Sequence, residues 1–220
     1  MLSYSARYDC LSPADSWQIF VIKRLLQISF EFMRLIVGLG NPGKEYENTR
    51  HNAGFHWIDC LADRLNLTLR LETRFHGLCA RISQDDIDLW LLEPQTYMNR
   101  SGLSVAELCQ FYKIQPDEII VVHDELDLLP GVAKLKWSGG LGGHNGLKDI
   151  AARLGTKDFW RLRIGIGHPG HRDAVVRFVL HPPGKEEAVL INEAIDRSLQ
   201  VWPLMAQGDL QSAMLKLHTQ

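Results

Sequence analysis

Several features that mark well-known classes of protein are missing from this sequence. Its four cysteines are scattered and form no C-x-x-C pair, so neither a disulfide framework nor a zinc ribbon is indicated, and reduced thiols in a cytoplasmic protein are expected. No serine stands in a G-x-S-x-G motif and no cysteine in a nucleophile signature, so covalent catalysis is poorly supported. His168 and His171 flank a proline-glycine turn without a cysteine or acidic partner, so no metal site is expected.

Long apolar runs, internal repeats and an excess of one charge are missing as well. The segment 17–32 is rich in large apolar side chains, but Lys23, Arg24 and Glu31 interrupt it, so it indicates neither a transmembrane span nor a signal sequence. The formal net charge of -2 argues against a general polyanion binder. Residues 130–181, however, carry nine Lys and Arg against three Asp, a local net charge of +6. Such a segment indicates either a face directed at a polyanion or an ordinary solvated surface.

The length and composition favour one domain. At 220 residues, 45% of them hydrophobic, the chain can bury one sizeable core. Its first 32 residues look unlike the rest, and Met33 stands directly before the first strand pattern. We therefore predict an N-terminal extension over residues 1–32, outside the fold, with Met33 as the start of translation and a single domain over residues 33–220. A short amphipathic helix on a membrane surface is the alternative for the extension.

The rest of the sequence alternates strand and helix patterns. Apolar runs predict strands at 34–38, 78–82, 88–92, 119–123, 132–137 and 162–167, and helices at about 52–66, 101–112, 147–154 and 185–202. The continuous apolar run 119–123 is typical of a central strand that is covered on both faces. In the second helix, Ser104 and Glu107 have the spacing of a capping box. The pattern predicts an α/β fold, with a twisted mixed β-sheet flanked by helices.

A glycine motif follows the first strand. Gly38, Gly40 and Gly43 satisfy G-x-G-x-x-G, which would indicate a dinucleotide site. Such a site needs a helix directly after the third glycine and an acidic residue at the end of the second strand. Here a polar segment follows Gly43, and Asp59 falls inside a helical pattern. A dinucleotide-binding oxidoreductase is therefore the weaker interpretation.

Two strand patterns place basic residues on one side. Lys134 and Lys136 alternate with apolar residues in the run 132–137, and Arg161 and Arg163 do the same in 161–166. If the two strands are neighbours, they form a face that could bind phosphates. The same alternation is also ordinary for an antiparallel sheet with one solvated face.

Polar residues also gather where the chain is expected to turn. Asn99 precedes a helix, where it could bind a ligand or simply serve as an N-cap. Asp124 follows the buried run 119–123, at the end of a strand where open α/β sheets place their sites. His144 and Asn145 end a glycine-rich loop, whose flexible backbone could approach a ligand closely.

Five ordered segments resemble those of bacterial peptidyl-tRNA hydrolase: Leu35 to Gly54, Thr96 to Gly102, His123 to Ala133, Gly142 to Asp149 and Arg161 to Gly170. The resemblance runs from Met33 to the C-terminus and makes residues 33–220 the catalytic domain. It has two departures: Leu141 stands where a histidine is expected, and Glu93 stands where a lysine is common.

The resemblance implies cleavage of the ester between tRNA and a peptide, or another N-blocked aminoacyl group, so that tRNA is recycled. His51 would be the general base that takes a proton from water, and Asp124 would orient it. Asn145 would position the water or stabilise the oxyanion. No cofactor and no metal are implied.

Binding residues are implied in the same way. The peptidyl part would contact a set of side chains near the ester: Asn41, Tyr46, Tyr97, Met98, Asn99, His144 and Asn145. The tRNA phosphates would contact Lys134, Lys136 and Arg163, with Lys148 and Arg161 as less certain partners. A cytoplasmic monomer without a membrane contact or a stable protein partner is expected. The alternative is a non-catalytic RNA-binding homologue with the same fold, but the complete set of site residues favours the enzyme.

Overall fold

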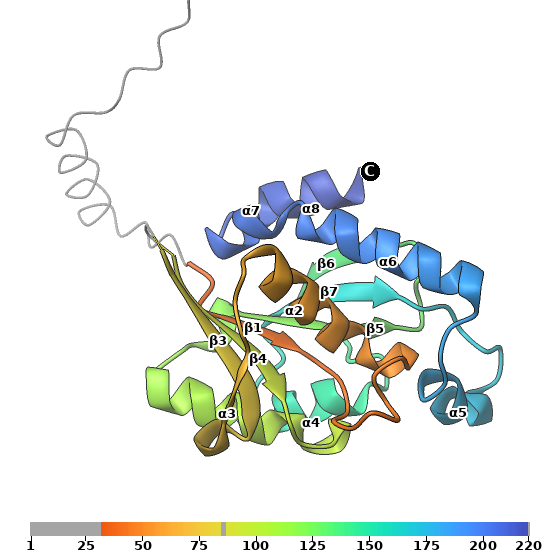
Figure 1. Ribbon diagram of the computed structural model, residues 1–220, viewed down its shortest axis with the longest axis horizontal. Helices are drawn as coiled ribbons and strands as arrows, with labels where there is room; N and C mark the ends of the chain where they lie inside the picture. The colour runs from red at the N-terminus through yellow and green to blue at the C-terminus, as the bar shows by residue number, and fades with distance from the viewer. Residues whose placement is uncertain (1–31, 85–86, 220) are drawn as a thin grey trace, which may run out of the picture. The chain divides into compact units, whose positions relative to one another are not determined.

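The structure is a computed structural model that describes residues 32–84 and 87–219 (Figure 1). The chain divides into two units, residues 1–30 and 31–220, and the described residues all belong to the second. The N-terminal extension lies almost wholly outside the described residues, so its exclusion from the fold stays a prediction. Among the described residues, no helix combines the length and the apolar character that crossing a bilayer requires.

A seven-stranded mixed sheet forms the centre of the domain, in the order β2-β3-β4-β1-β5-β7-β6. Its strands are β1 (Leu35–Gly38), β2 (Arg70–Glu72), β3 (Gly77–Gln84), β4 (Ile87–Pro94), β5 (Ile119–Glu125), β6 (Ala133–Trp137) and β7 (Trp160–Gly165). The four central strands β4, β1, β5 and β7 run parallel, while β2, β3 and β6 run antiparallel to their neighbours. The carboxyl ends of the parallel strands therefore meet at one edge of the sheet.

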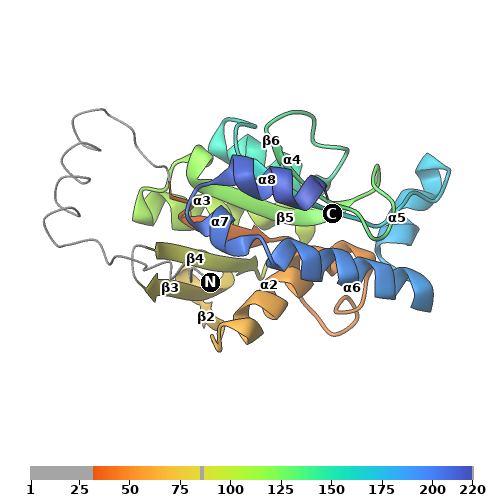
Figure 2. The same ribbon diagram turned by 90° about the horizontal axis from the view of Figure 1, so that it is seen from above.

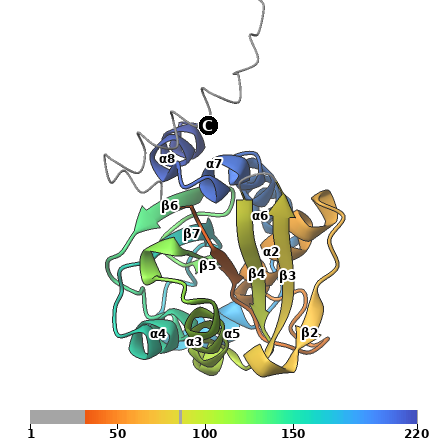
Figure 3. The same cartoon turned by 90° about the vertical axis from the view of Figure 1, so that its left-hand side faces the viewer.

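Helices cover both faces of this sheet (Figure 3). One face carries α2 (Ala53–Arg64), α6 (Lys185–Leu199), α7 (Trp202–Ala206) and α8 (Leu210–His218), and the other carries α3 (Ser101–Tyr112) and α4 (Asn145–Leu154). Helices α2 and α6 lie side by side (Figure 2). The short helix α5 (Val175–Val179) and the 3-10 turns complete the list: η1 (Arg50–Asn52), η2 (Thr73–Phe75), η3 (Met98–Arg100), η4 (Pro116–Glu118) and η5 (Arg172–Ala174).

Side chains on the two faces of β5 belong to two separate apolar cores. Ile120 and Val122 pack with α2 and α6, whereas Ile119 and Val121 pack with α3 and α4. Every residue of β5 is buried, which confirms the prediction of a central strand that is covered on both faces.

A close approach of backbones explains part of the glycine-rich motif. A Cβ atom on Gly54, at the start of α2, would lie 2.3 Å from the backbone nitrogen of Leu39 and 2.4 Å from the carbonyl oxygen of Val122. The first turn of α2 can therefore touch the ends of β1 and β5 only if residue 54 is glycine. This contact fixes the preceding turn η1 against the carboxyl edge of the sheet.

The main predicted elements are present, with ends shifted by a few residues. The helix expected at 185–202 ends at Leu199, and β2, α5, α7 and α8 were not predicted. The capping box at Ser104 is wrong. Helix α3 already begins at Ser101, and the hydroxyl group of Ser104 donates a hydrogen bond from inside the helix to the carbonyl oxygen of Phe75.

Candidate active site

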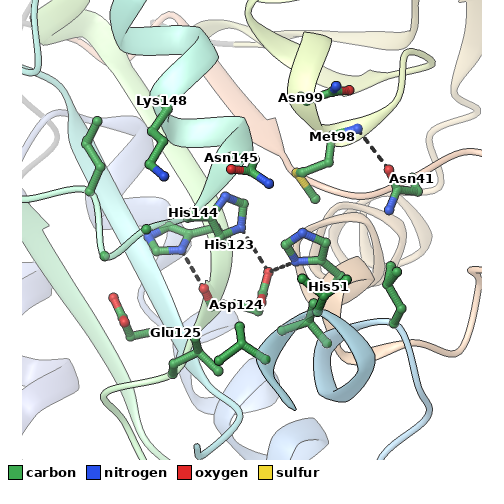
Figure 4. Close-up of a pocket in the computed structure, with 18 of the residues that line it drawn as sticks. Asn41, His51, Met98, Asn99, His123, Asp124, Glu125, His144, Asn145 and Lys148 are labelled. Atoms are coloured by element: carbon green, nitrogen blue, oxygen red, sulfur yellow. Dashed lines mark hydrogen bonds and ion pairs between the residues drawn. The ribbon is translucent and has the colours of Figure 1, made fainter. Parts of the chain in front are cut away.

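A cavity of about 620 Å³ opens at the carboxyl ends of β1 and β5 (Figure 4). Its lining includes all but one of the predicted catalytic and peptidyl-binding residues, which come from four separate segments: Asn41, His51, Tyr97, Met98, Asn99, Asp124, His144 and Asn145. Tyr46 is not part of the lining, but its ring lies edge-on to that of Tyr97, with 6.5 Å between the centroids. The sequence segments that were expected to hold the site therefore converge.

His51 and Asp124 form a hydrogen-bonded pair in this cavity. Nδ1 of His51 lies 2.9 Å from Oδ1 of Asp124, and Asp124 is buried, with 4% of its surface exposed. Because a carboxylate only accepts, Nδ1 of the neutral imidazole carries the hydrogen and Nε2 keeps a free lone pair. His51 therefore has the tautomer that a general base needs.

The pKa values of this pair follow from burial and charge. Burial lowers the pKa of His51, but the charge of Asp124 and the hydrogen bond to it raise the pKa more, so the net shift is upward. Burial would raise the pKa of Asp124, but the neighbouring His51 and His144 hold it well below its usual range. Asp124 is therefore ionised at neutral pH, and its charge favours proton uptake by His51.

His144 binds the same carboxylate oxygen. Its Nε2 atom lies 3.0 Å from Oδ1 of Asp124, and its Nδ1 atom accepts a hydrogen bond of 3.4 Å from the backbone N–H of Leu147. The second bond caps the N-terminus of α4. Both ring nitrogens are thus occupied, so His144 would reach a ligand only through its ring carbon atoms. Its contact with the peptidyl part stays a prediction.

His123 was not predicted as a site residue, although it lines the cavity. It is almost fully buried, and its Nδ1 atom donates a hydrogen bond of 2.7 Å to the carbonyl oxygen of Asp124. Burial lowers the pKa of His123 to about 3, so its ring is neutral. A neutral His123 adds no positive charge to the surroundings of Asp124.

His51, Asp124 and His144 form a donor set that could hold a metal ion. One ligand atom from each lies within 4.8 Å of the other two. Sequence spacing could not show this set, because its members come from η1, β5 and the loop before α4. The expectation that no metal is needed stays a prediction.

The side chain of Asn41 is held in one orientation. Its Oδ1 atom accepts a hydrogen bond of 2.8 Å from the backbone N–H of Met98. Asn52 holds the backbone of the same residue, because Oδ1 of Asn52 accepts from the N–H of Asn41 and Nδ2 donates to its carbonyl oxygen, both at 2.9 Å. The amide of Asn41 therefore has its NH₂ group left to donate to a ligand. No role for Asn52 was predicted from the sequence, although its position next to His51 could have indicated one.

The basic strands β6 and β7 are antiparallel neighbours, as the phosphate-face hypothesis requires. Lys134 lies opposite Arg163 and Lys136 lies opposite Arg161, so all four side chains start from the same side of the sheet. Both lysines are exposed.

The two arginines differ from the lysines. Arg161 is buried and donates hydrogen bonds to the carbonyl oxygens of Ser138 and Gly140, so it holds the glycine-rich loop and does not belong to an exposed face. Nε of Arg163 lies 2.8 Å from Oε2 of the buried Glu125. Arg163 therefore brings little uncompensated charge to the face, and its phosphate contact stays a prediction.

Comparison with known proteins agrees with this geometry. Residues 35–220 match the family of peptidyl-tRNA hydrolases. A peptidyl-tRNA hydrolase of Nitrosospira multiformis is 66% identical over 188 residues, which cover 86% of this chain and 98% of that protein. One from Nitrosomonas europaea is 64% identical over 187 residues, with 85% and 96% covered. The crystal structure of peptidyl-tRNA hydrolase from Acinetobacter baumannii has a TM-score of 0.82 at 49% identity and covers 84% of this chain and 94% of that one. The chain belongs to the peptidyl-tRNA hydrolase family.

Proposed function

We propose that this protein is an enzyme that hydrolyses the ester bond of peptidyl-tRNA, with His51 as the residue that activates water. The substrate is a peptide, or another N-blocked aminoacyl group, esterified to tRNA that has left the ribosome. The hydrogen bond of 2.9 Å between Nδ1 of His51 and Oδ1 of Asp124 carries this proposal. It leaves a basic Nε2 atom beside a cavity that is large enough for a substrate end.

The chemistry requires one proton to move twice. Nε2 of His51 takes a proton from water while the water oxygen attacks the ester carbonyl carbon. The tetrahedral intermediate then breaks its bond to the ribose oxygen, which takes the proton back from His51. The products are a free peptide acid and tRNA with its terminal hydroxyl group restored. The ionised Asp124 stabilises the positive imidazolium ring between the two transfers.

Asn145 would serve the intermediate. It is the first residue of α4, whose N-terminal N–H groups carry a partial positive charge. Its neutral NH₂ group can donate a hydrogen bond to the oxyanion or hold the attacking water. Because the amide does not titrate, this contribution would be the same over the working pH range.

Recognition of the peptidyl part would depend on its main chain. The amides of Asn41 and Asn99 would bind peptide N–H and C=O groups, which are the same in every peptide. Met98 and Tyr97 line the same part of the cavity, with Tyr46 next to Tyr97. Side-chain-independent recognition of this kind suits an enzyme that must accept any interrupted peptide.

Recognition of tRNA would depend on phosphates. Lys134 and Lys136 form the exposed basic pair on β6, with Arg163 beside them and Lys148 at the cavity. Phosphate contacts position a nucleic acid without reading its sequence, so one enzyme could serve many tRNAs. The proposal includes a cytoplasmic monomer that needs no cofactor, and light scattering of the purified protein would test its monomeric state.

Release of free tRNA from N-acetylated aminoacyl-tRNA tests the function directly, with unblocked aminoacyl-tRNA as the comparison. We expect rapid release from the blocked substrate and much slower release from the unblocked one. Binding of tRNA without release from either substrate would instead identify a non-catalytic RNA-binding protein.

A further inference from the structure

Arg50 directly precedes His51 in η1 but points to a different part of the molecule. It is buried, with 8% of its surface exposed, which is rare for an arginine without a specific partner. The hydrogen bonds of its side chain all go to the segment 178–187, which joins α5 to α6. Two consecutive residues of one turn therefore contact two different parts of the site. His51 contacts Asp124 at the end of β5, and Arg50 contacts the segment 178–187.

The guanidinium group of Arg50 is bound on several sides. Nη1 donates to the carbonyl oxygens of Phe178 at 3.2 Å, His181 at 3.1 Å and Pro182 at 3.0 Å. Nη2 lies 2.6 Å from Oε2 of Glu187, and the group stacks on the ring of Phe178 with 4.1 Å to its centroid. The backbone N–H of Arg50 adds a bond of 3.3 Å to the carbonyl oxygen of His181. A flat fork of N–H donors can satisfy this set, whereas the point charge of a lysine cannot.

These contacts join the end of one helix to the start of the next. Phe178 lies in the last turn of α5, and His181 and Pro182 follow directly after the helix, so the three carbonyl groups lie where the chain leaves α5. Glu187 lies in the first turn of α6, and the same Oε2 atom also accepts from the N–H of Gly184 at 2.9 Å. Arg50 thereby fixes the position of α5 from its C-terminal end.

Helix α5 forms one wall of the substrate cavity. Val175, Val176 and Val179 line the cavity, together with Leu180 just after the helix. In two perpendicular views, α5 lies at one end of the described domain, apart from the helices that cover the sheet (Figures 1 and 2). It packs against η1, the turn that carries both Arg50 and His51.

We propose that Arg50 is a positioning residue, which fixes the apolar α5 wall relative to His51 so that a substrate resting on this wall presents its ester to Nε2. The inference rests on the proposed function, because it requires the substrate to lie in this cavity. The apolar contacts of this wall are made with the bound substrate before the reaction, so a displaced wall should weaken binding and raise KM.

Arg50→Lys is the first test, because it keeps the charge and removes the fork. Its matched control is Arg64→Lys. Arg64 also ties α2 to α6, with 2.5 Å between its Nη2 atom and Oδ1 of Asp196, but it is exposed and does not line the cavity. Kinetics with N-acetylated aminoacyl-tRNA are measured at a temperature at which circular dichroism shows every variant folded.

We expect Arg50→Lys to raise KM by about tenfold or more, because a loosened wall weakens the binding of the substrate. Arg64→Lys should leave both KM and kcat near the wild-type values. A purely structural role of Arg50 would lower the amount of folded enzyme, and so the apparent kcat, without changing KM. An unchanged KM in folded Arg50→Lys would therefore overturn the proposal.

Val176→Ala tests whether Arg50 acts through the wall. Val176 lines the cavity and is 67% exposed, so its truncation should not unfold the protein. In the wild-type background it should raise KM, whereas in the Arg50→Lys background it should add little, because the wall is already displaced. An equal effect in both backgrounds would mean that Arg50 does not act through α5, and the proposal would be wrong.

Glu187→Gln decides the matter if Arg50→Lys does not fold, because it keeps the shape of the side chain and removes only its charge. KM should again rise, by less than in Arg50→Lys, and an unchanged KM would reject the role of Arg50.

His51→Ala separates this inference from the proposed function. If His51→Ala keeps turnover, the proposed function itself fails; if it loses turnover while KM stays unchanged in both other variants, only the role of Arg50 fails.

Discussion

Nδ1 of His51 and Oδ1 of Asp124 lie 2.9 Å apart, although 73 positions separate the two residues in the sequence. This one bond sets the tautomer of the imidazole ring and places a buried negative charge behind it. The bond thereby orients the ring, leaves a lone pair on Nε2 and raises the pKa of His51.

His51→Ala should remove the base and leave the binding surfaces in place. We expect kcat to fall on the order of 10²-fold or more, with the Kd for tRNA nearly unchanged. His56→Ala is the control, since His56 is an exposed histidine on the following helix, where it contacts Asn192. Steady-state kinetics and a tRNA binding isotherm measure both quantities. A variant that keeps its kcat and only raises KM would show that His51 binds substrate and does not act as the base.

Asp124→Asn should change the dependence of the rate on pH. The pKa of His51 is raised in the wild type, so kcat/KM should rise with pH and reach half of its maximum above pH 6.5. Without the carboxylate, the remaining influence is burial, which lowers the pKa of His51, so this rising limb should move to lower pH. The plateau should also fall, on the order of 10²-fold or more, because an amide does not hold the same tautomer. If kcat/KM rose over the same pH range in Asp124→Asn as in the wild type, Asp124 would not be the group that raises the pKa of His51.

Lys134→Ala combined with Lys136→Ala should weaken tRNA binding and its dependence on salt. Each lost phosphate contact should reduce the slope of log K against log salt concentration by up to about 1. Lys157→Ala, in an exposed position of the same basic segment outside β6 and β7, is the control and should leave the slope unchanged. A short N-blocked aminoacyl ester without most of the tRNA should be hydrolysed equally well by the double variant and the wild type. An unchanged slope in the double variant would exclude β6 as the phosphate face.

The strand end at Asp124 and the loop before Asn145 could be predicted because they follow local rules, whereas the roles of His51 and Asn41 were implied only by the resemblance to peptidyl-tRNA hydrolase. The run 119–123 is apolar throughout, which indicates a buried central strand, and Asp124 comes directly after it. Asn145 begins a helix after a glycine-rich loop, and His51 stands in a turn before another helix. The ends of parallel strands meet at one sheet edge, so segments of this kind are brought together by topology alone.

The contacts of individual side chains could not be predicted in the same way. Strand alternation places Arg161 and Arg163 on one side. The burial of Arg161, however, depends on the loop that carries Ser138 and Gly140, and the pairing of Arg163 with Glu125 depends on β5 and β7 being neighbours. The partners of Arg50 lie more than 120 residues away in sequence. Short elements were missed for a related reason, because α5, with five residues, has too few turns to show a periodic pattern.

Glu93 departs from the expected lysine and has an unusual environment in the structure. It lies in β4 with 3% of its surface exposed, and its Oε1 atom has no hydrogen-bond partner among the described residues. Burial, together with the charge of Asp59 and a hydrogen bond shared with it, raises the pKa of Glu93 to about 8. The folded protein therefore keeps a proton on Glu93 at neutral pH, where the unfolded chain has lost it.

This difference should make stability depend on pH in a defined direction. Between the ordinary pKa of about 4.3 and a folded-state pKa of about 8, the folded state binds more protons, so the free energy of unfolding should fall as pH rises. Glu93→Gln keeps the neutral shape at every pH. It should match the wild type near pH 4.5 and exceed its stability near pH 9 by an amount on the order of a few kcal/mol. Urea unfolding of both proteins at several pH values measures the difference, with the exposed Glu107→Gln as the control. If the difference between Glu93→Gln and the wild type were the same at pH 4.5 and pH 9, the raised pKa of Glu93 and its protonated state at neutral pH would have to be rejected.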